Sequence, residues 1–287
     1  MEEGICPRLT VEHPALAGLF LMSKILSDKP ERISLSAYIE LFMNLTRREV
    51  KGRYSQSLFG AGWAIAQPLA TMAVFTLVFA RLGQMPSGGA PYPLFAYAAL
   101  VPWFFFSNSV MSGTMSLVTY RNIVTKTYFP REIVPLAQVG SRLVDITAAS
   151  GLYVLLMLYY GLGITPWAAL IPVFLLLLLL FTVGVTLATS AINVFYRDVN
   201  PVVQIGLQLW LYLTPVAYPL EAVPERYRLF FLLNPLTGVV EGLRSVLVFG
   251  REPEWGVVGI SAALILAILI GALILFKSTD KYFADVI

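Results

Sequence analysis

The sequence has almost none of the residues that build disulfides and most metal centres. It holds one cysteine, Cys6, and one histidine, His13, among 287 residues. A single cysteine excludes an internal disulfide and a cysteine-ligated metal cluster, and a single histidine excludes the usual multi-histidine zinc and haem sites. No G-x-x-x-x-G-K-[ST] phosphate loop occurs, so the chain cannot hydrolyse ATP by that route. We expect no catalytic residue and no metal site on this chain.

Charged residues are also scarce. Asp, Glu, Lys and Arg make up 13% of the chain, about half of the roughly 25% found in soluble domains. Hydrophobic residues make up 57%, and a soluble fold with so few charges could not cover its own surface. The composition indicates an integral membrane protein. A net charge of +3 is too small to indicate nucleic-acid binding and fits basic loops that meet anionic lipid headgroups.

Uncharged stretches locate the membrane spans. A transmembrane helix needs about 20 apolar residues, and the stretch 146–196 is long enough for two spans joined by a turn at residues 161–166. The other uncharged stretches supply one span each. We expect an all-α membrane protein with six transmembrane helices, over residues of about 62–81, 94–118, 135–160, 168–192, 201–218 and 256–276.

The distribution of lysine and arginine predicts the orientation. If both termini are cytoplasmic, fifteen of these residues lie on the cytoplasmic side and five on the outer side. Cytoplasmic loops carry the excess of Lys and Arg in membrane proteins. The N-terminal tail, residues 1–34, begins with the acidic Met1-Glu2-Glu3 and does not resemble a signal peptide. We expect this tail and the C-terminus in the cytoplasm.

Residues 35–58 have the pattern of a helix that lies in the membrane interface. Apolar side chains recur at spacings of three and four, and a belt of cations accompanies them. Such a helix places its apolar face at the acyl boundary and its cations near phosphates. The alternative is a plain juxtamembrane linker. The stripe consists of Leu35, Ile39, Phe42, Thr46, Val50, Tyr54 and Leu58, and the cations are Arg47, Arg48, Lys51 and Arg53.

Residues 219–254 predict a re-entrant pair of helices on the outer side. Two apolar runs there are too short to cross a membrane, and Asn234-Pro235 separates them. Short runs of this kind are tolerated where protein or water satisfies the backbone. Glu241 and Arg244, three residues apart, are expected to pair on one helix face. The pair either serves the function or merely pins the two helices together.

Short strings rich in glycine, proline and aromatic residues follow one another along these spans. They are Arg53–Gly60 followed by Gly62-Trp63-Ala64 and Gln67-Pro68-Leu69, then Pro91–Phe95, Leu100–Trp103, Phe129–Glu132, Asn193–Val199, Pro215–Pro219 and Leu233–Leu236. Together, and in this order, they resemble the membrane subunit of ABC-2 type polysaccharide exporters, above all the exporters of O-antigen and capsule. The resemblance covers residues from about 35 to the C-terminus.

That resemblance implies partners outside this chain. Members of the family are homodimeric permeases that pair with two copies of a separate ATP-binding subunit, which would hold ATP and Mg²⁺. They move a glycan attached to a polyprenyl-diphosphate lipid from the cytoplasmic leaflet outward. On this basis we expect a permease of the cytoplasmic (inner) membrane that contacts membrane lipids and binds no nucleic acid. The missing phosphate loop agrees with a nucleotide site on another chain.

The resemblance also implies roles for two segments. Residues 121–132 correspond to the cytoplasmic coupling segment that docks on the ATPase, and residues 219–249 correspond to paired helices that gate the exit. The coupling residues expected on this basis are Arg121, Lys126, Phe129, Pro130, Arg131 and Glu132. The outer-gate residues are Asn234, Pro235, Glu241 and Arg244.

Aromatic side chains in the spans are candidates for the translocation path, because sugar rings have apolar faces that pack on aromatic rings. Trp and Tyr also collect at membrane interfaces, so anchoring or core packing is the alternative for each of them. Side chains three or four residues apart share a helix face. The expected path residues are Trp63, Phe75, Phe79, Trp103, Phe106, Trp210 and Tyr218.

Two other functions compete with polysaccharide export. A membrane-embedded transferase acting on lipid-linked sugars needs clustered acids or bases at the headgroup level. Here Arg142 and Asp145 are the main candidates, and they fit an internal ion pair better. An ABC-2 exporter of teichoic acid or of a hydrophobic drug would share the same architecture. The aromatic residues and Pro91-Tyr92-Pro93 favour polysaccharide.

Overall fold

A computed structural model describes residues 34–55, 59–60, 62–126 and 129–286, which form helices and turns and no strand. This confirms the all-α class. The α-helices are α2 (Leu35–Tyr54), α3 (Gly62–Phe75), α4 (Tyr92–Thr119), α5 (Arg121–Lys126), α6 (Ile133–Tyr159), α7 (Ile171–Phe195), α8 (Val199–Leu213), α9 (Glu225–Leu232), α10 (Pro235–Leu247), α11 (Trp255–Thr279) and α12 (Phe283–Val286). A π-helix η1 (Thr76–Leu82) continues α3, and the 3-10 helices are η2 (Pro166–Leu170), η3 (Leu220–Ala222) and η4 (Asp280–Tyr282).

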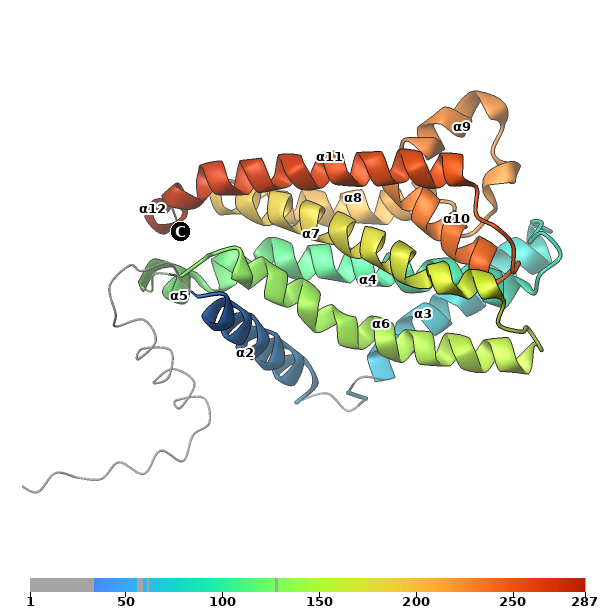
Figure 1. The fold of residues 1–287 in the computed structure, drawn as a ribbon, viewed down its shortest axis with the longest axis horizontal. Coiled ribbons are helices and arrows are strands. Elements are labelled where there is room, and N and C mark those ends of the chain that lie inside the picture. The colour runs from blue at the N-terminus through green and yellow to red at the C-terminus, as the bar shows by residue number, and fades with distance from the viewer. Residues whose placement is uncertain (1–33, 56–58, 61, 127–128, 287) are drawn as a thin grey trace, which may run out of the picture.

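The long helices run roughly side by side along the molecule (Figure 1), with α5 and α12 at one end and α9 and α10 at the other. Five helical segments of the described chain are long and apolar enough to cross a membrane, or six if the bent pair α9–α10 is counted as one span. The five segments are Gly62–Leu82, Tyr92–Thr119, Ile133–Tyr159, Pro166–Phe195 and Trp255–Tyr282.

The span expected at 201–218 is shorter in the structure. It corresponds to α8, which has 15 residues and ends at Leu213. Pro215 explains the early end, because a proline disfavours the helical conformation of the residue before it. Thr214 accordingly has an extended backbone, with ψ at 137°. Residues 214–219 therefore continue as turns and not as helix.

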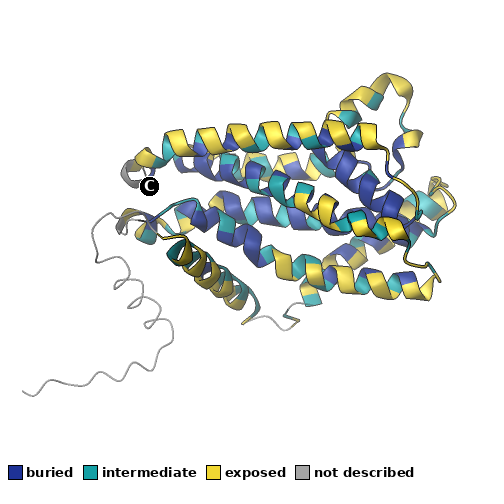
Figure 2. Ribbon diagram, in the orientation of Figure 1, coloured by how far each residue is buried: buried dark blue, intermediate teal, exposed yellow. Residues whose placement is uncertain are grey.

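Helix α4 is the centre of the bundle. It packs against α6 and α7 and also contacts α3 and α10, and Figure 2 shows most of its surface as buried. Its most apolar window is 78% buried, against 17–28% for the other four candidate spans. Gly113 permits the close approach to α7, since a Cβ there would lie 2.1 Å from Thr186 Cγ2. The outer helices, by contrast, keep an exposed apolar face for lipid or for another chain.

The outer segment forms the expected bent pair of helices. Helices α9 and α10 meet at 99°, and the bend falls at Asn234-Pro235, where Pro235 is the first residue of α10. Within α9 no residue is buried, whereas most of α10 is. Gly242 allows α10 to pack closely against α7, because any other residue would place a Cβ 2.1 Å from Phe174 Cε1. Thus α10 is part of the core and α9 projects from it.

Helix α2 lies against α6 near the α5 end of the bundle (Figure 1). Ser34 precedes its first residue, and the Ser34 hydroxyl accepts a hydrogen bond from the backbone N–H of Ala37, the usual N-cap arrangement. Leu45 packs on Ile133 and Ala137 of α6 with its neighbours on α2. The expected stripe is thus divided: Phe42 faces α6, whereas Leu35 and Ile39 are exposed. The expected end of this helix, residues 56–58, lies outside the described residues.

Candidate functional site

The expected coupling segment is tied to the C-terminal end of the chain. Helix α5 contacts α12. The Phe129 side chain is 5% exposed and belongs to an apolar cluster with Phe276 and Phe283. Arg131 Nη1 lies 3.3 Å from Asp280 Oδ1 and also donates to the Asp280 carbonyl. The structure therefore joins residues 129–131 to the end of α11.

The other expected coupling residues have different surroundings. Arg121 is exposed on α5, and Pro130 and Glu132 are half-buried at the start of α6. The side chain of Lys126 lies outside the described part of the structure. Burial raises the pKa of Tyr38 on α2, and the charge of Glu132 adds to the rise, so α2 lies beside this segment. A docking role for these residues stays a prediction.

Helix α2 is also held to the C-terminal end of α4 by a tyrosine. The Tyr120 hydroxyl donates to Glu49 Oε1. Burial, and then this bond to Glu49, raises the pKa of Tyr120 to about 12, so the hydroxyl keeps its proton at neutral pH. A hydrogen bond thus joins α2 to the residue that precedes α5.

Asn234 joins the outer helical pair to α8. Its Oδ1 accepts hydrogen bonds from the Leu236 backbone N–H and from Trp210 Nε1, both at 3.1 Å. Its Nδ2 donates to Thr214 Oγ1 at 2.9 Å and to the Leu213 carbonyl at 3.2 Å. As the N-cap of α10, Asn234 fixes where that helix begins. The same side chain forms hydrogen bonds with Trp210, Leu213 and Thr214 at the end of α8.

Arg244 is fully buried and joins three elements. Its Nη1 donates to Glu241 Oε1 at 2.9 Å, as the three-residue spacing predicts. Its guanidinium carbon lies 3.7 Å from the centre of the Phe95 ring, a cation–π contact with α4. The guanidinium also donates to the carbonyls of Phe95, Pro215, Val216 and Tyr218. The charge of Arg244 is therefore compensated within the fold, and it pins α10 to α4 and to the turns after α8.

Two of the aromatic residues expected in the path, Trp103 and Phe106, are packed inside the bundle. Their side chains are 4% and 0% exposed. The ring of Phe106 stacks on Phe181 with 4.9 Å between ring centres, and Trp210 meets it edge-on at 5.5 Å. These contacts favour the packing alternative for Trp103 and Phe106. A path role for them stays a prediction.

The remaining candidates are nearer the surface. Phe75 and Phe79 share a face as expected and pack edge-on at 5.3 Å, with Phe75 buried and Phe79 half-buried. Trp63 is 57% exposed at the start of α3. Tyr218 is half-buried, and its hydroxyl donates to the Tyr212 carbonyl at 2.6 Å.

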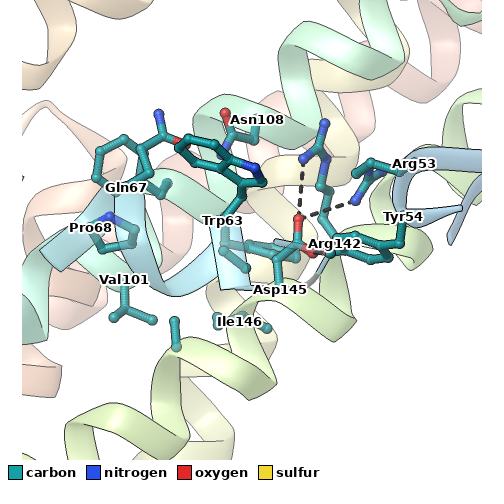
Figure 3. A pocket seen from close by; sticks show the side chains of 15 residues that line it. Arg53, Tyr54, Trp63, Gln67, Pro68, Val101, Asn108, Arg142, Asp145 and Ile146 are labelled. Carbon is teal, nitrogen blue, oxygen red and sulfur yellow. Dashed lines mark hydrogen bonds and ion pairs between the residues drawn. The ribbon is translucent and has the colours of Figure 1, made fainter. Parts of the chain in front are cut away.

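A charged pocket lies where α2, α3, α4 and α6 meet (Figure 3). Arg53 and Arg142 approach the same oxygen, Asp145 Oδ2, each at 3.1 Å. The Tyr54 hydroxyl donates to the other oxygen, Oδ1, and Arg53 Nη2 also donates to Ser141 Oγ at 2.7 Å. Burial and the bond to Asp145 raise the pKa of Tyr54. One carboxylate thus serves two guanidinium groups.

The rest of the pocket wall is mixed in character. Trp63, Phe104 and Ile146 supply apolar surface, and the amides of Gln67 and Asn108 supply polar groups. The volume is about 120 Å³, enough to admit several water molecules. A small headgroup fits this space, whereas a folded glycan does not.

The sequence predicts only the ion pair on α6 within this pocket. The spacing of Arg142 and Asp145 predicts their pairing, but nothing in a helical pattern brings Arg53 and Tyr54 to them from 88 or more residues away. One signal was available. Arg53 and Asp145 are each the last charged residue before a long uncharged stretch, 54–80 and 146–196. Such residues lie at the edge of the membrane and are expected at a common depth.

Comparison with known proteins places these features in a family. A family model described as "ABC-2 type transporter" matches residues 40–248. The chain is 31% identical over 253 residues to an O-antigen export system permease protein of Myxococcus xanthus, which covers 88% of this chain and 96% of that relative. It is 28% identical over 222 residues to the permease of the same name from Klebsiella pneumoniae, covering 76% and 84%. A polysialic acid transport protein of Escherichia coli is 23% identical over 240 residues, covering 82% and 91%.

Proposed function

Since this chain belongs to the ABC-2 type transporter family, we propose that it is the permease subunit of an exporter that moves a polysaccharide of the O-antigen or capsule kind across the cytoplasmic membrane. The observation that carries the proposal is the similarity to an O-antigen export permease over 88% of the chain. The family match also includes the coupling segment, the central bundle and the outer helical pair within residues 40–248. The glycan would be attached to a polyprenyl diphosphate.

The permease would act with a separate ATP-binding subunit that holds ATP and Mg²⁺. The absence of a phosphate loop from the sequence supports this division of labour. The end of the bundle that carries α2 and α5 would face the cytoplasm and the partner, with both chain termini on that side. The excess of lysine and arginine at this end supports the orientation.

Two copies of the chain would enclose the path. The middle of one protomer is packed with Phe106, Phe181 and Trp210, so a glycan has no room between these helices. Helix α3 with η1 and helix α8 carry exposed apolar faces, which include Val78 and Leu209. In a dimer such faces would lie at the second copy or in lipid. Trp63 and Phe79 belong to α3 and η1, and the Tyr218 hydroxyl donates to the carbonyl of Tyr212 on α8.

Export in cells tests the function. Cells without the gene should accumulate the lipid-linked glycan on the cytoplasmic side of the membrane, and the intact gene should restore surface polysaccharide. Normal surface polysaccharide together with lost teichoic acid or lost drug resistance would contradict the proposal.

A variant at residue 131 tests the coupling role in the same cells. Arg131→Ala removes the ion pair to Asp280, so the coupling segment should no longer move with α11. We expect at least a tenfold loss of export per ATP hydrolysed, with normal amounts of the complex in the membrane. Arg251→Ala, at an arginine that is 61% exposed and lies outside the expected coupling and gate segments, is the matched control and should export normally. Equal export by the Arg131 variant would show that the assignment is wrong.

A further inference from the structure

The charges in the pocket of Arg53, Arg142 and Asp145 do not balance. Two guanidinium groups share one carboxylate oxygen, which leaves a net charge of +1 among these three side chains. The side chains are only 22%, 19% and 14% exposed, so water screens the excess charge poorly. A buried charge without a partner costs free energy, and an anion would remove that cost.

One donor in the pocket also lacks a partner. Among the described residues, no group accepts a hydrogen bond from Arg142 Nε, although that atom is buried. Buried donors are nearly always paired, and an exception points to a missing ligand, water or ion. Guanidinium groups bind carboxylates and phosphates through two parallel N–H bonds. The chemistry of the pocket is therefore that of an anion site.

The depth of the pocket identifies the source of the anion as a lipid. Beyond Asp145 the rest of α6, residues 146–159, carries no charge and rises about 21 Å, enough for most of the hydrocarbon core. No charge follows Arg53 before Arg81. The three charges thus lie at the boundary between hydrocarbon and headgroups, where phosphates are.

The walls suit a headgroup with a chain attached. Trp63 is 57% and Phe59 is 70% exposed, and their rings meet edge-on at 5.5 Å. Trp63, together with Phe104 and Ile146, gives the pocket an apolar side next to its charged side. Trp is a usual anchor at this level of a membrane.

We propose that this pocket binds the phosphate headgroup of a membrane lipid. Arg53 and Arg142 donate to the phosphate oxygens, and Trp63 packs on the first part of the lipid chain. Asp145 holds both guanidinium groups in place before the phosphate binds and competes with the phosphate for them. The phosphate comes either from the polyprenyl diphosphate of the exported glycan or from an anionic phospholipid. The first source rests on the proposed function.

Native mass spectrometry of the full-length permease with its ATP-binding partner tests the proposal. The probes are undecaprenyl diphosphate and, separately, phosphatidylglycerol, each titrated against a phosphatidylcholine background. Arg53→Gln and Arg142→Gln should each weaken binding about tenfold, the loss expected from one charge-assisted hydrogen bond. Arg81→Gln removes an exposed cation of η1, outside both the pocket and the cation belt of α2, and should bind like the original protein.

Asp145→Asn separates a binding site from a structural ion cluster. It removes the competing charge, so it should bind the lipid phosphate more tightly than the original protein, with both arginines intact. Weaker binding by Asp145→Asn, or unchanged binding by both glutamine variants, would overturn the proposal. Stronger effects on undecaprenyl diphosphate assign the site to the carrier lipid, and equal effects on phosphatidylglycerol assign it to a bulk lipid.

Export measured in the same variants keeps the two proposals apart. If the glycan is exported but the pocket variants bind lipid like the original protein, the lipid site is overturned and the proposed function stands. If lipid binding depends on the arginines but deletion of the gene leaves surface polysaccharide intact, the proposed function is overturned and the lipid site stands.

Discussion

Two arginines lie in the apolar bundle with a carboxylate three residues away on the same helix, and the fold treats them differently. Arg244 pairs with Glu241 on α10, and Arg142 pairs with Asp145 on α6. The donors of Arg244 reach four backbone carbonyls besides its carboxylate. Arg142 shares its carboxylate with Arg53 and keeps a buried Nε–H without a partner among the described residues.

The difference separates a structural ion pair from a binding site. Once removed from water, a charge is stable only with several good partners. Arg244 has them within the chain, so α10, α4 and the turns after α8 form one rigid unit. Arg142 has an incomplete set, so a partner from outside the chain completes it. The same three-residue spacing thus gives a structural ion pair at Arg244 and a lipid-phosphate site at Arg142.

The largest effect is expected from Arg244→Gln. The change leaves Glu241 and the carbonyls of Phe95 and Val216 without their donor, at a cost of about 3–5 kcal/mol. Thermal unfolding of the purified protein in detergent measures the loss. Arg251→Gln is the control, because its side chain is 61% exposed and lies 3.9 Å from Glu221, and it should leave the unfolding temperature unchanged. Equal unfolding temperatures for the two variants would contradict a structural role for Arg244.

A smaller loss is expected from Gly242→Ala, which tests the packing of the same rigid unit. The new methyl group would lie 2.1 Å from Phe174 Cε1, in a side chain that is 1% exposed. Such overpacking costs about 1–3 kcal/mol. Gly151→Ala on α6 is the control, since nothing lies within 4 Å of its Cβ position, and it should stabilise its helix slightly. An unchanged unfolding temperature for Gly242→Ala would show that α10 is loosely packed.

The smallest effect on folding is expected from Arg142→Gln. Asp145 keeps Arg53 and Tyr54 as partners, and the change removes both the excess positive charge and the unpaired Nε–H, so the loss should be well below that of Arg244→Gln. The same unfolding measurement as for Arg244→Gln gives a direct ranking. A loss as large as that of Arg244→Gln would mean that Arg142 is a structural residue like Arg244.

The secondary structure could be predicted where a local signal was strong. Asn234-Pro235 predicts the break between α9 and α10, and the structure has it there. The end of α8 was misplaced by about five residues, because a charge-free stretch continues through Thr214-Pro215 and only the backbone restriction of Pro215 stops the helix. Pro215 is visible in the sequence, but the predicted end of the helix relied on the length of the uncharged stretch, which continues past the proline.

The surroundings of the candidate site residues depend on neighbours distant in the chain. The structure places Phe129 and Arg131 against Phe283 and Asp280, contacts that no local pattern predicts. An aromatic residue in a span looks the same in a sequence whether it lines a path or fills a core. The contact of Phe106 with Phe181, which favours core packing, comes from the structure alone.

The sequence by itself determined that the chain is an all-α membrane protein, which stretches are long and apolar enough to cross a membrane, and which family it resembles. These properties follow from charge-free length and local backbone preferences, which act over a few residues along the chain. The tertiary structure decided that α4 is the buried helix, that Arg244 is satisfied, and that Arg53 joins Arg142 and Asp145. Those outcomes depend on which helix faces meet. A buried charge is stable only with suitable partners, and key partners here, Asp145 for Arg53 and Phe95 for Arg244, lie about 90 to 150 residues away, where no local pattern predicts them.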